Sequence, residues 1–195
     1  LVMCVFAVAL LLVERNIRDI DLQDRSSAVV KLFEQKLDKD ANLMQAVLRA
    51  IKSNAAVERA LADRDREALA RLSGPLFEAL RGEHRLTHLY FHRSDLVNLY
   101  RAHSPDQFGD EVDRVTTGDA RRKGAPASGL ELGPLGTLTL RAVMPRERNG
   151  ELLGYIEIGE EIAHLIDEVR RSLNVGLLVL VEKQRIAPDE WRRGL

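Results

Sequence analysis

An unbroken apolar segment opens the chain and leads into a long stretch without helix-breaking residues. Residues 1–13 are all apolar, and the first Gly or Pro of the chain is Gly74. Because Gly and Pro are the residues that most often interrupt helices, a helix is predicted to continue from the apolar segment into a stalk. A bilayer-spanning helix needs roughly 20 residues, so we expect residues 1–13 to be the C-terminal part of a transmembrane helix. A signal peptide cleaved near Ala9 is the alternative.

Apolar residues in the stalk recur every three or four positions, a spacing typical of one helix face. They are Val30, Phe33, Leu37, Ala41, Met44, Leu48, Ile51 and Ala55. We therefore assign residues 14–60 to a stalk helix. A stretch of ~40 residues would be roughly 60 Å long. The apolar face fits packing on a domain and also pairing of two copies in a homodimer.

A second helix is predicted over residues 63–80, where leucines recur at near-helical spacing. Pro75 lies inside this segment, and an interior proline costs a helix about 3 kcal/mol. We expect Gly74 and Pro75 to kink the helix or to divide it in two. Gly82 fits a helix end.

Beyond Gly82 the apolar positions alternate with polar ones, which indicates strands. The predicted strands are 86–92, 96–103, 128–132, 136–145, 152–159 and 176–181. A weak helix is expected over 110–123 and a clear one over 160–173. Turn residues at Ser94-Asp95 and at Asn149-Gly150 predict hairpins. Hairpins imply an antiparallel sheet, so the predicted class is α+β.

Composition excludes several classes of function. The chain carries 29 basic and 30 acidic residues, for a net charge of −1, which argues against nucleic-acid binding. Its one cysteine, Cys4, allows neither an internal disulfide nor a cluster of thiolate metal ligands. No Gly-x-Ser-x-Gly, His-Glu-x-x-His or phosphate-binding loop is present. We therefore expect no enzyme and no cofactor.

Five short segments, in a fixed order, resemble a known family. They are 89–92 (LYFH), 99–110 (LYRAHSPDQFGD), 128–133 (SGLELG), 140–145 (LRAVMP) and 154–159 (GYIEIG). In this order, behind an apolar segment and a long helix, they resemble the extracytoplasmic double Cache sensor domain of bacterial chemoreceptors and sensor histidine kinases. The resemblance covers roughly residues 25–195.

This resemblance implies a PAS-like antiparallel sheet packed on the long N-terminal helix, with a small-molecule pocket in the membrane-distal lobe. Residues 61–174 would form that lobe, and residues 175–195 would begin a membrane-proximal lobe that is cut short. A second membrane helix and a cytoplasmic output domain are expected beyond it. The sensor would lie in the periplasm, anchored to the bacterial inner membrane.

Alternation along the strands sorts the side chains into two faces. His88, Tyr90 and His92 share one face of their strand, with Leu89 and Phe91 on the other. Equivalent polar faces carry Thr137, Thr139 and Arg141 in one strand, and Tyr155 and Glu157 in another. The apolar faces should pack on the long helix, and the polar faces should line a cavity under the loops of residues 104–128. A solvated sheet face is the alternative.

Candidate ligand-binding residues follow from these faces. Arg141 or Arg101 could hold a carboxylate in a bidentate geometry. Tyr90, His92 and Tyr155 would flank the ligand. Glu157 would accept from an amine or hold an arginine in place.

Histidine is the commonest metal ligand among side chains. On a strand, His88 and His92 would be about 13 Å apart, too far for one ion, although His103 on a neighbouring strand could approach them. His164 is expected to be a surface or packing residue of its helix. No metal site is predicted.

Taken together, the sequence predicts an extracytoplasmic sensor of a small polar or anionic molecule, part of a transmembrane signalling receptor. The alternative is a membrane-tethered periplasmic adaptor that binds another protein. A cavity on the polar face would favour the sensor, and a flat exposed face with apolar patches would favour the adaptor.

Overall fold

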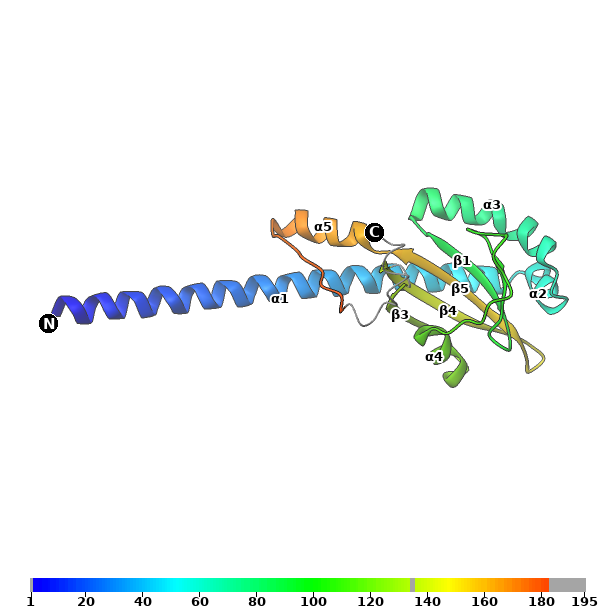
Figure 1. The fold of residues 1–195 in the computed structure, drawn as a ribbon, viewed down its shortest axis with the longest axis horizontal. Helices are drawn as coiled ribbons and strands as arrows, with labels where there is room; N and C mark the ends of the chain where they lie inside the picture. Colours follow the sequence, from blue (N-terminus) through cyan, green and yellow to red (C-terminus); the bar gives the residue numbers. More distant parts are fainter. Residues whose placement is uncertain (1, 134–135, 183–195) are drawn as a thin grey trace.

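The computed structural model describes residues 2–133 and 136–182. A 51-residue helix, α1 (Val2–Lys52), leads into a head of shorter helices and strands (Figure 1). The other elements described are α2 (Ala55–Ala62), α3 (Arg66–His84), β1 (His88–Arg93), β2 (Asn98–Arg101), α4 (Val115–Lys123), β3 (Ala127–Leu132), β4 (Leu138–Arg148), β5 (Glu151–Glu161) and α5 (Ala163–Leu173). Residues 183–195, which hold most of the predicted second lobe, lie outside the described residues, as does Leu1.

The strands form one antiparallel sheet in the order β2-β1-β5-β4-β3. Both predicted hairpins are present, between β1 and β2 and between β4 and β5. Asn149 and Gly150 have φ values of 53° and 82°, the positive values that a tight two-residue hairpin turn requires. The predicted α+β class, with an antiparallel sheet and a long N-terminal helix, is confirmed.

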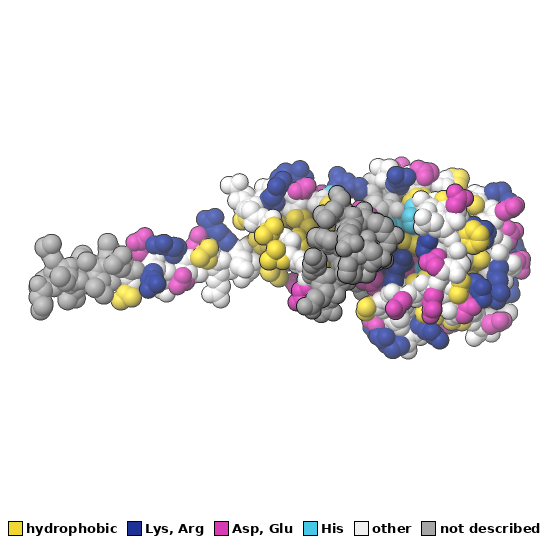
Figure 2. All heavy atoms as spheres, in the orientation of Figure 1, with side chains coloured by type: hydrophobic (Ala, Val, Ile, Leu, Met, Phe, Trp, Pro, Cys, Tyr) yellow, Lys and Arg dark blue, Asp and Glu magenta, His cyan; other side chains and the backbone are white. Residues whose placement is uncertain are grey.

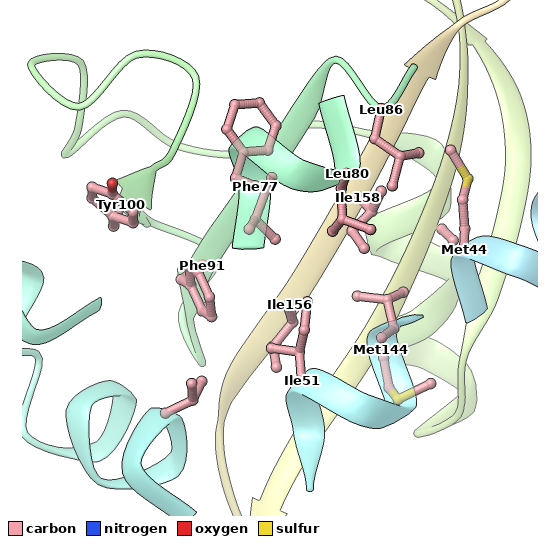
Figure 3. Close-up of a cluster of buried hydrophobic side chains, with 14 of the residues drawn as sticks. Met44, Ile51, Phe77, Leu80, Leu86, Phe91, Tyr100, Met144, Ile156 and Ile158 are labelled. Carbon is pink, nitrogen blue, oxygen red and sulfur yellow. The ribbon is translucent and has the colours of Figure 1, made fainter. Parts of the chain in front are cut away.

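The apolar face of the sheet packs on the C-terminal part of α1. Met44 and Leu48 are fully buried there, and Ile51 is 4% exposed. Figure 3 shows α1 and α3 side chains meeting those of the sheet, among them Phe77, Phe91, Met144, Ile156 and Ile158. Each side chain buried in this way stabilises the fold by about 1.5–3 kcal/mol. The predicted apolar stripe is thus the face that holds the head on the helix, although Val30, at its start, is exposed.

α1 ends at Lys52, before the predicted end of the stalk at residue 60, because Asn54 caps a separate helix. The Asn54 side chain accepts hydrogen bonds from the backbone N–H groups of Ala56 and Val57, at 2.9 and 3.4 Å. Such a cap satisfies donors that have no partner inside the helix.

Within the described part of the chain, no helix is both long enough and apolar enough to cross a membrane.

The opposite face of the sheet is covered by α4 beside β3 and β4. Ala120 of α4 packs in a small apolar cluster with Ala127, Val143 and Tyr155. Elsewhere on this face the strand side chains are polar. The predicted division of the strands into an apolar and a polar face is confirmed.

α5 lies alongside α1, so the chain returns towards the long helix after the sheet (Figure 1). Leu165 and Val169 of α5 are buried, and Lys36 Nζ forms an ion pair with Glu168 Oε2 at 2.6 Å. The helix begins at Ala163, not at residue 160 as predicted.

The late start of α5 follows from the length of β5. Glu160 and Glu161 pair with Leu140 and Thr139 as the last rungs of the β4–β5 ladder. Burial raises the pKa of Glu160 to about 7, and the nearby carboxylate of Asp40 acts in the same direction. Glu160 is therefore a buried acid at the point where β5, α5 and α1 meet.

One predicted strand was wrong, and of the two effects expected of Pro75, a kink or a division of its helix, the division was wrong. Residues 176–181 form no strand, because the sheet ends at β2 and β3 and neither edge pairs with them. α3 is not divided at Pro75. Pro75 lies on the exposed side of α3, where water can serve the carbonyl left without its partner, while Leu69 and Phe77 are buried on the other side.

Gly154 lies where the neighbouring strand leaves no room for a side chain. A Cβ added there would lie 2.1 Å from the carbonyl oxygen of His92 on the neighbouring strand. We predict that Gly154→Ala lowers the free energy of unfolding by more than about 1 kcal/mol, measured by urea denaturation. Gly82→Ala is the matched control, since its added Cβ meets no described atom within 4 Å. The control should be neutral or gain up to about 1 kcal/mol of helix propensity, and equal stability of the two variants would contradict the prediction.

Candidate ligand-binding site

A buried carboxylate, that of Glu157, organises the polar face of the sheet. Glu157 Oε1 accepts hydrogen bonds from Arg141 Nη1, at 2.6 Å, and from Arg114 Nη1. Its Oε2 accepts from His92 Nε2 at 3.0 Å and from Thr117 Oγ1 at 3.2 Å. β1, β4, α4 and the segment before α4 are therefore all joined to β5 through one side chain.

Glu157 is ionised because these donors outweigh its burial. Its side chain has no exposed surface, and burial alone would raise its pKa. The hydrogen bond from His92 and the charges of Arg114 and Arg141 act in the opposite direction and hold the pKa well below the ordinary range of a glutamate. Of the two roles predicted for Glu157, holding arginines in place is the one that the geometry matches.

Arg114 extends this network to Tyr90. Arg114 Nη2 donates to the Tyr90 hydroxyl at 3.2 Å, and its guanidinium carbon lies 4.5 Å from the centre of the Tyr90 ring. Arg101 and Arg141 stand further from the same ring, at 5.6 and 6.0 Å. Three cationic groups thus surround one aromatic ring, an arrangement that cation–π attraction favours.

Glu131 forms a second carboxylate centre at the start of α4. Its Oε1 accepts from the backbone N–H and the hydroxyl of Thr116, and its Oε2 lies 3.5 Å from Arg141 Nε. The first N–H groups of a helix have no partner inside the helix and carry partial positive charge. The N-terminus of α4 together with Arg141 is therefore a place where this chain already binds a carboxylate, its own.

A cavity of about 800 Å³ opens beside these two centres. Its walls are the segment 110–116, Asp119 of α4, strand β3 with Gly133 just after it, Arg101 of β2 and Arg141 of β4. Both signs of charge line it: the basic residues are Arg101, Arg114 and Arg141, and the acidic ones are Asp110, Glu111, Asp113, Asp119 and Glu131. The size and the polar lining suit a small charged or zwitterionic molecule.

The six predicted site residues fall into three groups. Arg101 and Arg141 line the cavity, and Arg101 is held by Asp110. Tyr90, His92 and Glu157 are buried next to the cavity walls, in the network that fixes the arginines. Tyr155 does not join them, because it is 1% exposed in the apolar cluster beneath α4.

The sequence reading missed Arg114 and Glu131. Arg114 precedes a short helix with little apolar periodicity, so no pattern of spacing marked it. Glu131 alternates with Leu130 and Leu132 along β3, a signal that could have placed it on a polar face.

Histidines border the same network. The His103 ring lies 4.6 Å from that of His88 and 4.7 Å from that of Tyr90, between ring centres. Burial lowers the pKa of His88 to about 3, and the charges of His103, Arg141 and Arg114 act in the same direction. Burial also lowers the pKa of His103 to about 4, together with the charges of Arg101, Arg114 and Arg141. Both rings are neutral at pH 7.

These shifts predict a loss of stability in acid. A histidine in the unfolded chain has a pKa of about 6.5, so between pH 6.5 and 4 these two histidines bind more protons in the unfolded state than in the folded state. Their contribution to stability is fully present above pH 6.5 and is lost as the pH drops towards 4. We predict that His103→Gln makes the free energy of unfolding fall less steeply than in the wild type over this range, measured by urea denaturation at several pH values. Parallel curves for the two proteins would contradict it.

The arrangement of elements and of the polar face defines a sensor domain of the Cache class, with a PAS-like sheet. Residues 21–191 match a family described as the double sensory domain of two-component sensor kinase (dCache_3). The chain belongs to this family. No curated protein sequence is significantly similar to it.

Solved structures share the fold at low sequence identity. The sensor domain of E. coli DcuS is 19% identical with a TM-score of 0.56, and the match covers 72% of this chain and 99% of that domain. The sensor domain of the V. cholerae histidine kinase DctB is 14% identical with a TM-score of 0.62, over 80% of this chain and 58% of that one. A sensory box/GGDEF family protein from Vibrio parahaemolyticus is 13% identical with a TM-score of 0.59, over 83% and 72%. The predicted relation to Cache sensor domains is confirmed.

Proposed function

We propose that this chain is the extracytoplasmic sensing domain of a bacterial transmembrane receptor and that it binds a small polar or anionic molecule. The observation that carries the proposal is the cavity of about 800 Å³, lined by three arginines whose positions are fixed by carboxylates. Preorganised guanidinium groups are well suited to binding a carboxylate. The family supports a sensory role.

Arg114 is the best candidate for direct contact with the ligand. Its side chain is 21% exposed, whereas that of Arg141 is 5% exposed. A guanidinium has five N–H donors, more than the hydrogen bonds of Arg114 to Glu157 and Tyr90 use. A ligand carboxylate would add to these bonds without breaking them, while the acidic residues on the cavity wall would receive an amine.

The two faces of the sheet provide a route for the signal. The ligand would bind on the polar face, and α1 packs on the apolar face of the same strands. A ligand that binds one packing of the sheet on α1 better than another shifts the population between them. Residues 1–13 would pass this change to the membrane, and the apolar side of the stalk would pair two copies in a homodimer.

The comparison structures support dividing the chain into one lobe and the start of a second. This chain matches almost the whole of the DcuS domain but 58% of the DctB domain. We assign residues 61–174 to the membrane-distal lobe and residues 175–195 to the start of a membrane-proximal one.

The adaptor alternative called for a flat, exposed sheet face with apolar patches, whereas α4 and a polar cavity occupy this one. Acidic and basic side chains are interspersed over the visible face of the head (Figure 2).

The ligand is to be found by a thermal-shift screen of the full chain against organic acids, amino acids and amines. A ligand at 100 times its Kd stabilises the folded state by about 2.7 kcal/mol, so a hit should raise the Tm clearly. Arg114→Lys keeps the positive charge and loses the forked geometry. We predict that this variant binds an anionic hit at least about tenfold more weakly, measured by isothermal titration calorimetry.

Arg121→Lys, on the exposed side of α4, is the matched control and should bind as the wild type does. The proposal fails if no class of compound shifts the Tm. It also fails at Arg114 if the Arg114→Lys variant binds the hit with unchanged affinity.

A further inference from the structure

Three potential metal ligands meet at the junction of α1, β5 and α5, on the other side of the sheet from the ligand cavity. Asp40 comes from α1, Glu160 from the end of β5 and His164 from the first turn of α5. One ligand atom from each lies within 4.8 Å of the other two. The Glu160 side chain is 5% exposed and that of His164 is 23% exposed, so the group is sheltered and still reachable.

The orientation of His164 is that of a metal-binding histidine. Its Nδ1 lies 3.1 Å from the backbone carbonyl oxygen of Glu161. A carbonyl oxygen can only accept, so Nδ1 carries a proton, and Nε2, the ring nitrogen left to ligate a metal, points away from that carbonyl. Nε2 lies 2.9 Å from Glu160 Oε1, within the group. Metal-ligating histidines usually have their second ring nitrogen anchored in this way.

The surrounding charges favour a cation between Asp40 and Glu160. The two carboxylates lie close together, and two like charges at a partly buried site repel each other. Lys36 and Arg85 stand nearby, but both pair with Glu168, at 2.6 and 3.3 Å. The positive charges of Lys36 and Arg85 are therefore paired with Glu168 and not with Asp40 or Glu160. A bound cation would neutralise the negative charge of Asp40 and Glu160.

Space and access are also present. A second cavity, of about 320 Å³, is lined by Asp40, Glu160 and His164. Bonds of about 2.0–2.2 Å to nitrogen and oxygen in a tetrahedral site would place the ligand atoms roughly 3.4 Å apart. Small side-chain rotations from the observed spacing reach this geometry, and the cavity has room for a water as the fourth ligand.

We propose that Asp40, Glu160 and His164 form a binding site for a divalent transition-metal ion of the zinc type. One imidazole and two carboxylates suit Zn²⁺ and Co²⁺ better than Mg²⁺ or Ca²⁺, which take oxygen ligands. The ion would tie α5 and the end of β5 to α1, the helix on which the sheet packs. The site goes beyond the proposed sensing of a small molecule, and it departs from the sequence prediction, which gave His164 a surface or packing role.

The test is metal binding by the full chain after treatment with EDTA. Zn²⁺ affinity is measured by competition with a chromophoric chelator, and Co²⁺ supplies a visible spectrum that reports its coordination. We predict binding of one ion per chain by the wild type, and at least about tenfold weaker binding by His164→Gln and by Asp40→Asn. Asp40 is half-buried on α1, so Asp40→Asn should fold even if His164→Gln disturbs α5.

His103→Gln is the matched control, because it removes a histidine from the cluster beside the other cavity. It should bind Zn²⁺ as the wild type does. The proposal is overturned if the wild type binds no Zn²⁺, if both junction variants bind with unchanged affinity, or if His103→Gln is the variant that loses the ion. Thermal unfolding of each metal-free variant establishes that it is folded when tested.

Discussion

The charge of Glu157 lies in a part of the sheet that solvent does not reach, and the polar half of the domain is arranged to compensate it. An ion loses several kcal/mol of hydration when it is buried, so a carboxylate there needs close donors. Arg141 of β4, His92 of β1, and Arg114 and Thr117 at the start of α4 supply them from three parts of the chain. Because these donors must be in place for the head to fold, two of the arginines that line the cavity, Arg114 and Arg141, are positioned before any ligand binds.

The two faces of the sheet therefore have different roles: one packs on the helices, and the other holds the charged network. Its apolar face buries Ile156 and Ile158 against the helices, and its polar face holds Glu157 between them in the sequence of β5. A displacement of β5 cannot alter one set of contacts and leave the other unchanged. This shared strand is the physical basis for expecting a signal to pass from the cavity to α1. The junction of Asp40, Glu160 and His164 lies at the end of the same strand.

Much of this could be predicted from the sequence, because the pattern that indicates strands is local. Alternation in residues 88–92 and 154–159 was enough to place Tyr90, His92 and Glu157 on one face and Phe91 and Ile156 on the other. The hairpin at Asn149-Gly150 followed from the positive φ that the turn demands. The five short segments indicated the relation to Cache sensor domains, which the family match bears out.

What could not be predicted depends on contacts between distant segments. Arg114 reaches Glu157 across 43 positions, and no periodicity in its own segment marks it. Tyr155 shares the face of Glu157 but is covered by α4, a helix whose docking the sequence does not reveal. Residues 176–181 are apolar enough for a strand, yet a strand also needs a partner, and neither edge of the sheet supplies one.

The direct test of the central claim is a double-mutant cycle between Glu157 and Arg141. The free energies of unfolding of the wild type, Glu157→Gln, Arg141→Gln and the double variant are measured by urea denaturation of the full chain. If the buried carboxylate fixes the arginine, the double variant will be more stable than additivity predicts, by about 1–3 kcal/mol. Effects that add to within about 0.5 kcal/mol would show that the two side chains act independently, and would contradict the account.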